Sequence, residues 1–205
     1  MRKKVKLLIA TSNSGKIREL RALLSNFNFE ILTPVEIGIL TIPEETGTSY
    51  LENALLKGQF YTDQSRMAVL ADDTGLEVDA LDGQPGLYSA RFSTLEEDAS
   101  DAERRRLLLQ KLQEKPQPWH AHFTCTAVLI DNQGNQYSAT GRCDGQIIST
   151  ERGVNGFGYD PIFLFPDLNK TMAELEMDQK NRISHRARAL HALSPDLLNL
   201  SRHTS

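Results

Sequence analysis

The chain is predicted to be an α/β protein with an antiparallel hairpin, and three patterns support this prediction. Short apolar runs that end in polar residues, such as Val5–Thr11 and Met67–Ala71, are typical of buried strands in an α/β sheet. Between them, Gly15–Phe27 has apolar residues at helical spacing and is expected to be a helix. Two later segments of strand composition, His120–Asp131 and Gln136–Ile148, flank a polar turn and predict the hairpin.

Further helices follow from start and stop signals. They are expected over Ser49–Thr62, Asp98–Glu114 and Ser184–Leu193. Ser49 and Glu52 have the spacing of a capping box at the start of the first. The many charges of the second are expected to form a solvated face, and Ser184 has the position of an N-cap in the third. The tail Asn199–Ser205 is expected to be disordered.

Composition limits the classes of protein that are possible. With 205 residues, the chain is expected to form one domain over residues 1–205 with one sizeable core. A net charge of −4 argues against a nucleic acid polymer as partner, because such binding needs a basic face. Cys125 and Cys143 suit neither a disulfide framework nor a metal site, so both are expected to be reduced packing residues. The apolar run Leu7–Ala10 is too short for a signal peptide, and no stretch has transmembrane length. A cytoplasmic protein without membrane contact is expected.

A polar turn between the first strand and the first helix has the parts of a phosphate-binding loop. Its residues are Thr11, Ser12, Asn13, Ser14, Gly15 and Lys16. Small residues let backbone amides approach an anion at a helix N-terminus, and a lysine adds a point charge. It is not a Walker A loop, because the first glycine of that motif is missing and Ile17 follows the lysine. An ordinary strand-to-helix turn is the alternative.

Two adjacent carboxylates, Asp72 and Asp73, follow the apolar run Met67–Ala71. At the carboxyl end of a strand, such a pair is costly unless it is solvated, paired or bound to a cation. Glu44 and Glu45 form a second acidic pair upstream. Carboxylate oxygens without nearby His or Cys ligands favour Mg²⁺, with Mn²⁺ as a substitute, over zinc. The alternative is that the aspartates belong to an ordinary turn and cap the next segment.

The clearest signal for a ligand lies near the C-terminus. Its residues are Phe157, Gly158, Tyr159, Asp160, Lys180, His185 and Arg186. A glycine-flanked aromatic pair can hold a flat ring, and an adjacent carboxylate can bind the edge of that ring. Lys180 and the first turn of the last predicted helix can hold phosphates. A nucleotide is therefore the expected ligand. His120 and His122, on one face of a predicted strand, are expected to be surface or satisfied residues rather than metal ligands.

Seven segments in order resemble the inosine triphosphate pyrophosphatase family, whose members hydrolyse nonstandard purine nucleoside triphosphates. They are Thr11–Lys16, Glu44–Gly47, Leu51–Lys57, Ala71–Leu76, Pro85–Phe92, Gly156–Pro161 and Lys180–Arg186. The residues around Asn53 and Arg91 are similar to those in the bacterial branch of this family. This resemblance implies a long twisted mixed sheet flanked by helices, with two lobes, a central nucleotide cleft and a homodimeric assembly. Gln84–Phe92 is the segment that we associate with the dimer surface.

The resemblance also implies roles for single residues. Glu44 and Asp73 would hold Mg²⁺, and Asp73 would also accept the proton of the attacking water, with Asp72 as a second candidate for either role. Thr11–Lys16, Lys57, Thr74 and Lys180 would bind phosphates. The remaining residues, Phe157–Asp160 with His185 and Arg186, would bind the base and its 6-oxo edge. For Arg186, a local cap or salt bridge is the alternative.

The implied reaction converts ITP, dITP or XTP to the monophosphate and pyrophosphate. Adenine presents a 6-amino donor where these bases present a 6-keto acceptor, so ATP is expected to be a poor substrate. Two alternatives are a pyrophosphatase for modified pyrimidine nucleotides and a sensor that holds a triphosphate without turnover. A sensor has no need of two carboxylate clusters, which favours the enzyme.

Overall fold

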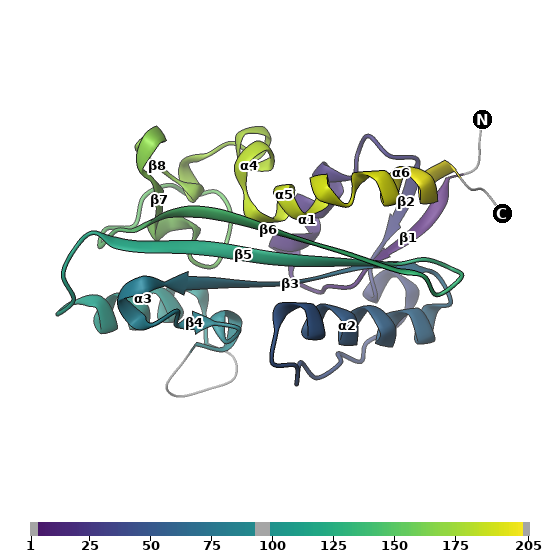
Figure 1. Ribbon diagram of the computed structural model, residues 1–205, viewed down its shortest axis with the longest axis horizontal. Coiled ribbons are helices and arrows are strands. Elements are labelled where there is room, and N and C mark those ends of the chain that lie inside the picture. The colour runs from purple at the N-terminus through teal and green to yellow at the C-terminus, as the bar shows by residue number, and fades with distance from the viewer. Residues whose placement is uncertain (1–3, 93–98, 203–205) are drawn as a thin grey trace. The chain divides into compact units, whose positions relative to one another are not determined.

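The computed structural model describes residues 4–92 and 99–202 and has an α/β fold (Figure 1). The helices within these residues are α1 Ser14–Leu23, α2 Tyr50–Ser65, α3 Asp101–Leu112, α4 Met177–Ile183, α5 His185–Ala192 and α6 Ser194–Arg202. The strands are β1 Val5–Ile9, β2 Phe29–Leu32, β3 Ala68–Val78, β4 Pro85–Gly86, β5 Trp119–Ile130, β6 Gln136–Ile147, β7 Phe163–Phe165 and β8 Lys170–Thr171. Short 3₁₀ helices occur in several connections.

The strands belong to one mixed sheet with the hydrogen-bonded order β2-β1-β3-β5-β6-β7-β8, and β4 pairs with β3 outside this path. β1 is parallel to both β2 and β3. By contrast, β4 is antiparallel to β3, and β7 is antiparallel to both β6 and β8. Parallel neighbours need long crossover connections, which α1 supplies between β1 and β2. The mixed sheet flanked by helices confirms the predicted fold class.

The chain divides into two compact units. Unit 1 comprises Met1–Asp73, Cys125–Gly141 and His185–Ser205, and unit 2 comprises Thr74–Thr124 and Arg142–Ser184. The boundaries fall inside β3, β5 and β6, so each of these strands contributes to both units. The predicted hairpin is therefore shared by the two units, and its turn belongs to unit 1. The expected nucleotide cleft stays a prediction.

Unit 1 buries apolar side chains on both faces of its central strands. In β1, Leu7 and Ile9 belong to one hydrophobic cluster and Leu8 to another, because alternate residues of a strand point to opposite faces. The first cluster includes residues of α1, α5 and α6, and the second includes Tyr61 of α2. Figure 1 shows α2 on one side of these strands and the other three helices on the opposite side. Burial on both faces explains the continuous apolar runs in the sequence.

Unit 2 has a core of its own that is rich in aromatic residues. Phe163 lies in this core, with its ring centroid 4.8 Å from that of Phe123 and 5.3 Å from that of Phe165. Trp119 and Tyr159 belong to the same cluster. Both cysteines are buried and form no disulfide, Cys143 in this core and Cys125 in unit 1, as expected.

Two predicted boundaries were wrong. The strand that was expected to end at Ala71 continues to Val78, so the acidic pair lies inside β3. The tail that was expected to be disordered forms the end of α6 as far as Arg202, because Leu197 and Leu200 pack on the core of unit 1. Residues 203–205 lie outside the described part. The other expected helices and both hairpin strands are confirmed within a few residues, although Asp98 also lies outside the described part.

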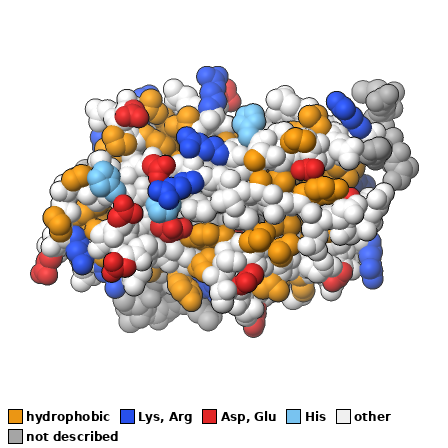
Figure 2. All heavy atoms as spheres, viewed as in Figure 1, with side chains coloured by type: hydrophobic (Ala, Val, Ile, Leu, Met, Phe, Trp, Pro, Cys, Tyr) orange, Lys and Arg blue, Asp and Glu red, His pale blue; other side chains and the backbone are white. Residues whose placement is uncertain are grey.

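Some large apolar side chains stay on the surface of unit 1. Figure 2 shows hydrophobic side chains in orange between charged ones on one face of the molecule. The exposed apolar residues of unit 1 include Val35, Leu40, Ile42, Leu51 and Leu56. In the stretches 4–92 and 99–202, none of the helices combines the length and apolar character that crossing a bilayer demands.

Candidate active site

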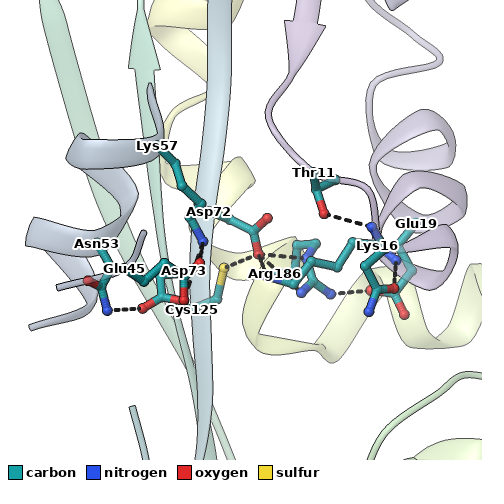
Figure 3. Close-up of polar contacts among 11 residues, drawn as sticks. Thr11, Lys16, Glu19, Glu45, Asn53, Lys57, Asp72, Asp73, Cys125 and Arg186 are labelled. Carbon is teal, nitrogen blue, oxygen red and sulfur yellow. Dashed lines mark hydrogen bonds and ion pairs between the residues drawn. The ribbon is translucent and has the colours of Figure 1, made fainter. Parts of the chain in front are cut away.

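The acidic pair of β3 is split between the two faces of the strand. Ala68 and Leu70 face the cluster that contains α1 and α5, whereas Val69 and Ala71 face α2. By the same alternation, Asp72 falls on the first face and Asp73 on the second. Figure 3 shows their side chains directed to these two different sets of partners. The turn that the sequence left open as an alternative is replaced by a strand, which gives each carboxylate its own surroundings.

Asp73 lies against one face of α2. Its Oδ2 accepts a hydrogen bond of 3.1 Å from Asn53 Nδ2, and its Oδ1 lies 3.5 Å from Lys57 Nζ. Lys57 Nζ also donates to Glu45 Oε1 at 2.7 Å. Asn53 and Lys57 are four residues apart in α2 and therefore lie on one helix face, one turn from each other. The structure thus brings the lysine that the sequence assigned to phosphate binding between two carboxylates.

Asp72 accepts from two cations on the opposite face. Its Oδ2 lies 3.0 Å from Lys16 Nζ of α1, and it accepts from Arg186 Nη2 at 3.2 Å and Nε at 3.3 Å. Arg186 Nη1 donates to Glu19, which lies one turn after Lys16 in α1. Asp72, Glu19 and Arg186 are almost completely buried, and Arg186 is only 1% exposed. Two carboxylates and two cations thus form a cluster with balanced charge that joins α1, β3 and α5.

Electrostatics keep the Asp72 carboxylate and the Lys57 ammonium charged at neutral pH. Burial alone would raise the pKa of the Asp72 carboxyl, but the neighbouring cations, led by Lys16 and Arg186, outweigh it and lower the pKa far below its ordinary value. Burial would also lower the pKa of the Lys57 ammonium, yet the carboxylates around it, led by Asp73 and Glu45, raise that pKa. Asp72 is therefore an ion-paired carboxylate, unsuited to accept a proton. Asp73 is the better candidate for a general base.

The placement of Arg186 favours the alternative that the sequence left open. All three of its guanidinium nitrogens donate to Asp72 or Glu19. A guanidinium with these partners holds α1, β3 and α5 together. To form a hydrogen bond with a purine base, it would have to give up its contacts with Asp72 or Glu19. His185, which precedes it in α5, is also buried. The assignment of both residues to the base stays a prediction.

The loop before α1 is built as a helix start. Asn13 is the N-cap, and its Oδ1 accepts from Lys16 N at 3.0 Å, while Thr11 Oγ1 accepts from Asn13 N at 3.2 Å. Asn13 and Ser14 are exposed, and Ser12 is exposed as well. The N-terminus of α1 therefore presents backbone N–H groups to solvent beside the Lys16 ammonium, an arrangement that suits an anion. Phosphate binding at this loop stays a prediction.

A divalent metal would find hard oxygen ligands here, but not a complete set of protein ligands. Across residues 4–92 and 99–202, no group of three His, Cys, Asp or Glu side chains is arranged to hold a metal ion. Mg²⁺ is commonly bound by only one or two carboxylates together with substrate phosphates and water. Asp73 fits that description. Glu44 is exposed, and it is Glu45 that contacts Lys57, so the pairing of Glu44 with Asp73 as metal ligands stays a prediction.

In unit 2, the glycine-rich segment around Tyr159 forms a tight structure. Asp160 Oδ2 accepts from Phe157 N at 2.9 Å and from Lys180 Nζ at 2.5 Å. Lys180 Nζ also lies 5.2 Å from the centroid of the Phe157 ring, within range of a cation–π interaction. Gly156 has φ +79° and leaves no room for a side chain, because a Cβ would meet Asp160 Oδ2 at 1.9 Å. Phe157, Asp160 and Lys180 are therefore brought together, as expected.

The two aromatic residues of that segment have different roles. Tyr159 is buried in the core of unit 2, and its hydroxyl donates to Ser89 O at 3.0 Å. A ring in this position anchors the segment. The assignment of Tyr159 to the base stays a prediction. Phe157 is only partly buried and keeps that assignment as a prediction, as does Gly158.

α3 holds the backbone of Gly158, which the sequence did not suggest. Asp101 Oδ2 accepts from Gly158 N at 2.7 Å, and Arg105 Nη1 donates to Gly158 O at 2.8 Å. Arg105 is fixed in turn by Glu151, with hydrogen bonds of 2.8 and 2.9 Å. The expected solvated face of this helix was therefore wrong for two of its charges. In the sequence, Asp101 and Arg105 cannot be distinguished from the many other charged residues of this helix.

The remaining site predictions have simple outcomes. Thr74 follows Asp73 in β3 and begins unit 2, and its role at phosphate stays a prediction. His122 Nε2 lies 2.8 Å from Glu77 Oε2, and His120 is exposed, which confirms that they are satisfied or surface residues. Asn53 and Glu19 were not predicted as site residues, and Glu45 was named only as part of the second acidic pair. Only the spacing of Asn53 and Lys57 in α2 could have revealed one of them.

Gly141 of β6 allows α5 to approach the sheet. A Cβ at this position would meet His185 O at 2.2 Å and Ala189 N at 2.4 Å. Gly141→Ala is therefore expected to lower the free energy of unfolding by at least about 1–3 kcal/mol, the usual cost of overpacking. Urea unfolding checks this result, with Ser138→Ala, at an exposed position of the same strand, as the control. Equal unfolding midpoints for the Gly141 variant and the parent chain would contradict the close packing.

Comparisons with known proteins agree over nearly the whole chain. The model of the Ham1 family matches residues 7–196. The dITP/XTP pyrophosphatase of Mannheimia succiniciproducens is 44% identical over 197 residues, covering 95% of this chain and 98% of the relative. That of Haemophilus ducreyi is 43% identical, with 95% and 99% covered. The solved structure of a HAM1 protein from Coxiella burnetii matches with a TM-score of 0.83 and 36% identity, covering 95% of this chain and 99% of that one.

Proposed function

Because this chain belongs to the Ham1 family, we propose that it hydrolyses nonstandard purine nucleoside triphosphates to the monophosphate and pyrophosphate. Relatives that are 43–44% identical over nearly their full length are named dITP/XTP pyrophosphatase, which supports dITP and XTP as substrates, with ITP as the related ribonucleotide. The family match also confirms the resemblance that the seven sequence segments indicated.

The observation that supports this function most directly is the division of labour across β3. Hydrolysis at the α-phosphorus needs a base for the attacking water and cations for the charge of the leaving pyrophosphate. Asp73 is the carboxylate on one face, beside Asn53 and Lys57. Lys16, held by Asp72 on the other face, stands at the N-terminus of α1. The general base and the cation that binds phosphate are thus different side chains, and each is held by different neighbours.

Asp73 positions and deprotonates the attacking water in this proposal. Its two oxygens are oriented by Asn53 and Lys57, so the carboxylate cannot rotate freely. Lys57 stays protonated at neutral pH and compensates part of the negative charge that a triphosphate brings. A general base of this kind contributes about 10²–10⁴-fold to a rate.

Mg²⁺, or Mn²⁺ in its place, is the proposed cofactor. Asp73 and Glu44 would hold it, with Glu45 as the acidic neighbour that already contacts Lys57. When bound, the ion would neutralise charge on the phosphates and polarise the reacting phosphoryl group. The Lys57 ammonium lies between the carboxylates of Asp73 and Glu45. When a metal ion binds there, the ammonium would have to share these carboxylates with the ion or move away from them.

Lys16 and the loop Thr11–Gly15 bind the phosphates in this proposal. The ammonium is partly exposed, since 16% of the Lys16 side chain remains accessible, and Asp72 orients it. In unit 2, Phe157, Gly158, Asp160 and Lys180 keep the proposed contacts to base and phosphate, and Thr74 a contact to phosphate. His185 and Arg186 would join them only if Arg186 gave up its ion pairs.

A sensor without turnover and a pyrophosphatase for modified pyrimidines are not favoured. A sensor needs no oriented base, whereas Asp73 is fixed at both oxygens. The relatives are named for purine nucleotides, which disfavours the pyrimidine alternative.

A homodimer in the cytoplasm completes the proposal. Large apolar side chains at the surface support an assembly, including Leu40 and Ile42 in unit 1, which are 78% and 69% exposed. In unit 2, Tyr88 is 66% exposed within the segment Gln84–Phe92, which supports our choice of that segment. Two cysteines that form no disulfide agree with a reducing compartment.

The activity is tested with a panel of nucleoside triphosphates in the presence of Mg²⁺. We expect ITP, dITP and XTP to yield monophosphate and pyrophosphate, and ATP to react hardly at all. The reason is that adenine has a donor where the others have a 6-keto acceptor, and an unpaired buried donor costs orders of magnitude in rate. Pyrophosphate and orthophosphate are measured separately. Orthophosphate as the primary product, or equal rates on ATP and ITP, would refute the proposed function.

A further inference from the structure

Asn53 uses both ends of its side-chain amide to join two segments of unit 1. Its Nδ2 donates to Asp73 Oδ2 at 3.1 Å, and its Oδ1 accepts from Gly47 N at 2.8 Å. Gly47 ends the acidic segment that begins at Glu44. The residue is only 1% exposed, so water does not compete for these hydrogen bonds.

The chemistry of the partners determines the orientation of this amide. An ionised carboxylate can only accept hydrogen bonds, and a backbone N–H can only donate. The NH₂ group must therefore face Asp73 and the oxygen must face Gly47. A residue without a donor toward Asp73 would lose the first contact, and a residue without an acceptor toward Gly47 N would lose the second.

Lys57 makes a parallel connection one helical turn later. Its ammonium lies 3.5 Å from Asp73 Oδ1 and 2.7 Å from Glu45 Oε1. α2 thus links the acidic segment to Asp73 twice, once through a charge and once through a neutral amide. Only the charged link competes with a metal ion for the carboxylates, whereas the amide link is compatible with a metal.

The packing around Gly47 leaves little freedom for the amide link. A Cβ at Gly47 would meet Asn53 Oδ1 at 2.7 Å and Asn53 N at 2.9 Å. The backbone of the acidic segment is therefore pressed directly against the start of α2. A glycine is required at this point, because any side chain would push the acidic segment away from Asn53.

We propose that Asn53 is a positioning residue for the hydrolysis, which orients the Asp73 carboxylate and keeps the acidic segment Glu44–Gly47 in register with it. This inference rests on the proposed function, because it assigns Asp73 the role of base and metal ligand. Asn53 itself touches neither the water nor the nucleotide. Partners that orient a metal-binding carboxylate contribute about 10–100-fold to metal affinity or activity.

Asn53→Asp separates the two contacts. The variant keeps an oxygen that accepts from Gly47 N, but it sets a second carboxylate against Asp73 Oδ2 in place of the donor. We expect kcat for ITP to fall about 10–100-fold, with a smaller change in KM. Hydrogen exchange of the Gly47 amide is expected to stay as slow as in the parent chain.

Asn53→Ser is the second variant, because a second buried acid beside Asp73 can prevent folding. It is neutral and too short to reach both partners, so we expect the loss in kcat together with faster exchange of the Gly47 amide. Binding of Mn²⁺ without nucleotide, followed by its paramagnetic resonance signal, is expected to weaken about 10-fold or more in this variant.

Gln59→Glu is the matched control. Gln59 Nε2 donates to Asp63 Oδ1 at 3.0 Å on the exposed side of the same helix, so the change from amide to acid is the same. Its kcat and Mn²⁺ affinity are expected to equal those of the parent chain.

The outcomes distinguish this inference from the proposed function. If the parent chain releases no pyrophosphate from any purine nucleotide, the function fails, while Gly47 exchange and Mn²⁺ affinity still test the role of Asn53. If Asn53→Ser keeps kcat, Mn²⁺ affinity and Gly47 protection within about twofold of the parent chain, well below the expected loss, the inference is refuted. A lower melting temperature with unchanged kcat and Mn²⁺ affinity would also refute it, because that result describes a purely structural residue.

Discussion

Asp73→Asn is expected to lower kcat by at least about a hundredfold, in line with the contribution of a general base, while the fold stays intact. The amide has the shape of the carboxylate and can still lie between Asn53 and Lys57. It lacks the negative charge that attracts a metal ion, and it cannot accept the proton of the attacking water. The loss should appear mainly in kcat and not in KM, because Asp73 acts on the reacting groups more than on ground-state binding.

Steady-state release of pyrophosphate from ITP, together with circular dichroism, checks this expectation. Asp63→Asn is a suitable control, because Asp63 also accepts from a side-chain amide of α2 but lies on the exposed side of the helix. Turnover near that of the parent chain in Asp73→Asn would contradict the assignment and transfer the role of base to another group.

Arg186→Ala is expected to lower the free energy of unfolding by about 3–5 kcal/mol, the usual cost of removing one partner from a buried ion pair. The substitution takes away the guanidinium that joins Asp72 to Glu19, and all of these side chains are buried. Arg142→Ala is the matched control. Arg142 also pairs with an aspartate, at 2.6 Å, but that pair is exposed and is expected to contribute only about 0–1 kcal/mol.

The pH dependence of the same variant gives a second measurement. The folded-state pKa of Asp72 is lowered, so its contribution to stability is present above the unfolded pKa of about 4 and is lost as the pH falls below that value. Without Arg186, the part of the stability that is lost on acidification should become smaller, although Lys16 still pairs with Asp72. A loss no larger than that of Arg142→Ala would contradict the ion-pair role.

The substrate ratio decides between the two interpretations of Arg186. If the residue only holds α1, β3 and α5 together, the ratio of kcat/KM for ITP to that for ATP should not change. If it donates to the 6-keto oxygen, that ratio should narrow by an amount worth about 1–3 kcal/mol, the cost of one lost hydrogen bond to a buried partner. The first result is the one that the observed contacts favour.

The sequence predicted the fold class and most elements correctly, because strong local signals mark them. Asn13 and Ser49 cap their helices, and the apolar runs follow the buried strands. It also grouped Phe157 and Asp160 with Lys180, which lies 20 residues after Asp160 in the chain. That grouping came from the residue types, since no local rule connects Asp160 to Lys180.

The errors concern residues whose surroundings are set by distant parts of the chain. Asp72 and Asp73 were expected to follow the end of the strand, because charged residues rarely continue a buried strand. They do so here because Lys16 and Arg186 on one side, and Lys57 on the other, compensate their charge. Glu19 and Asn53 looked like ordinary helical residues for the same reason. Only the folded chain brings their partners within hydrogen-bonding distance.

The alternation of β3 also limits how the length of this chain can vary. Exposed loops between elements generally tolerate added or lost residues, because the elements on either side can keep their own register. A single residue inserted or deleted between Ala68 and Asp72 would turn every later side chain of the strand to the opposite face. Asp72 would then point at α2 and away from its two cations. Length changes in this short stretch should therefore abolish function even where the hydrophobic pattern would tolerate them.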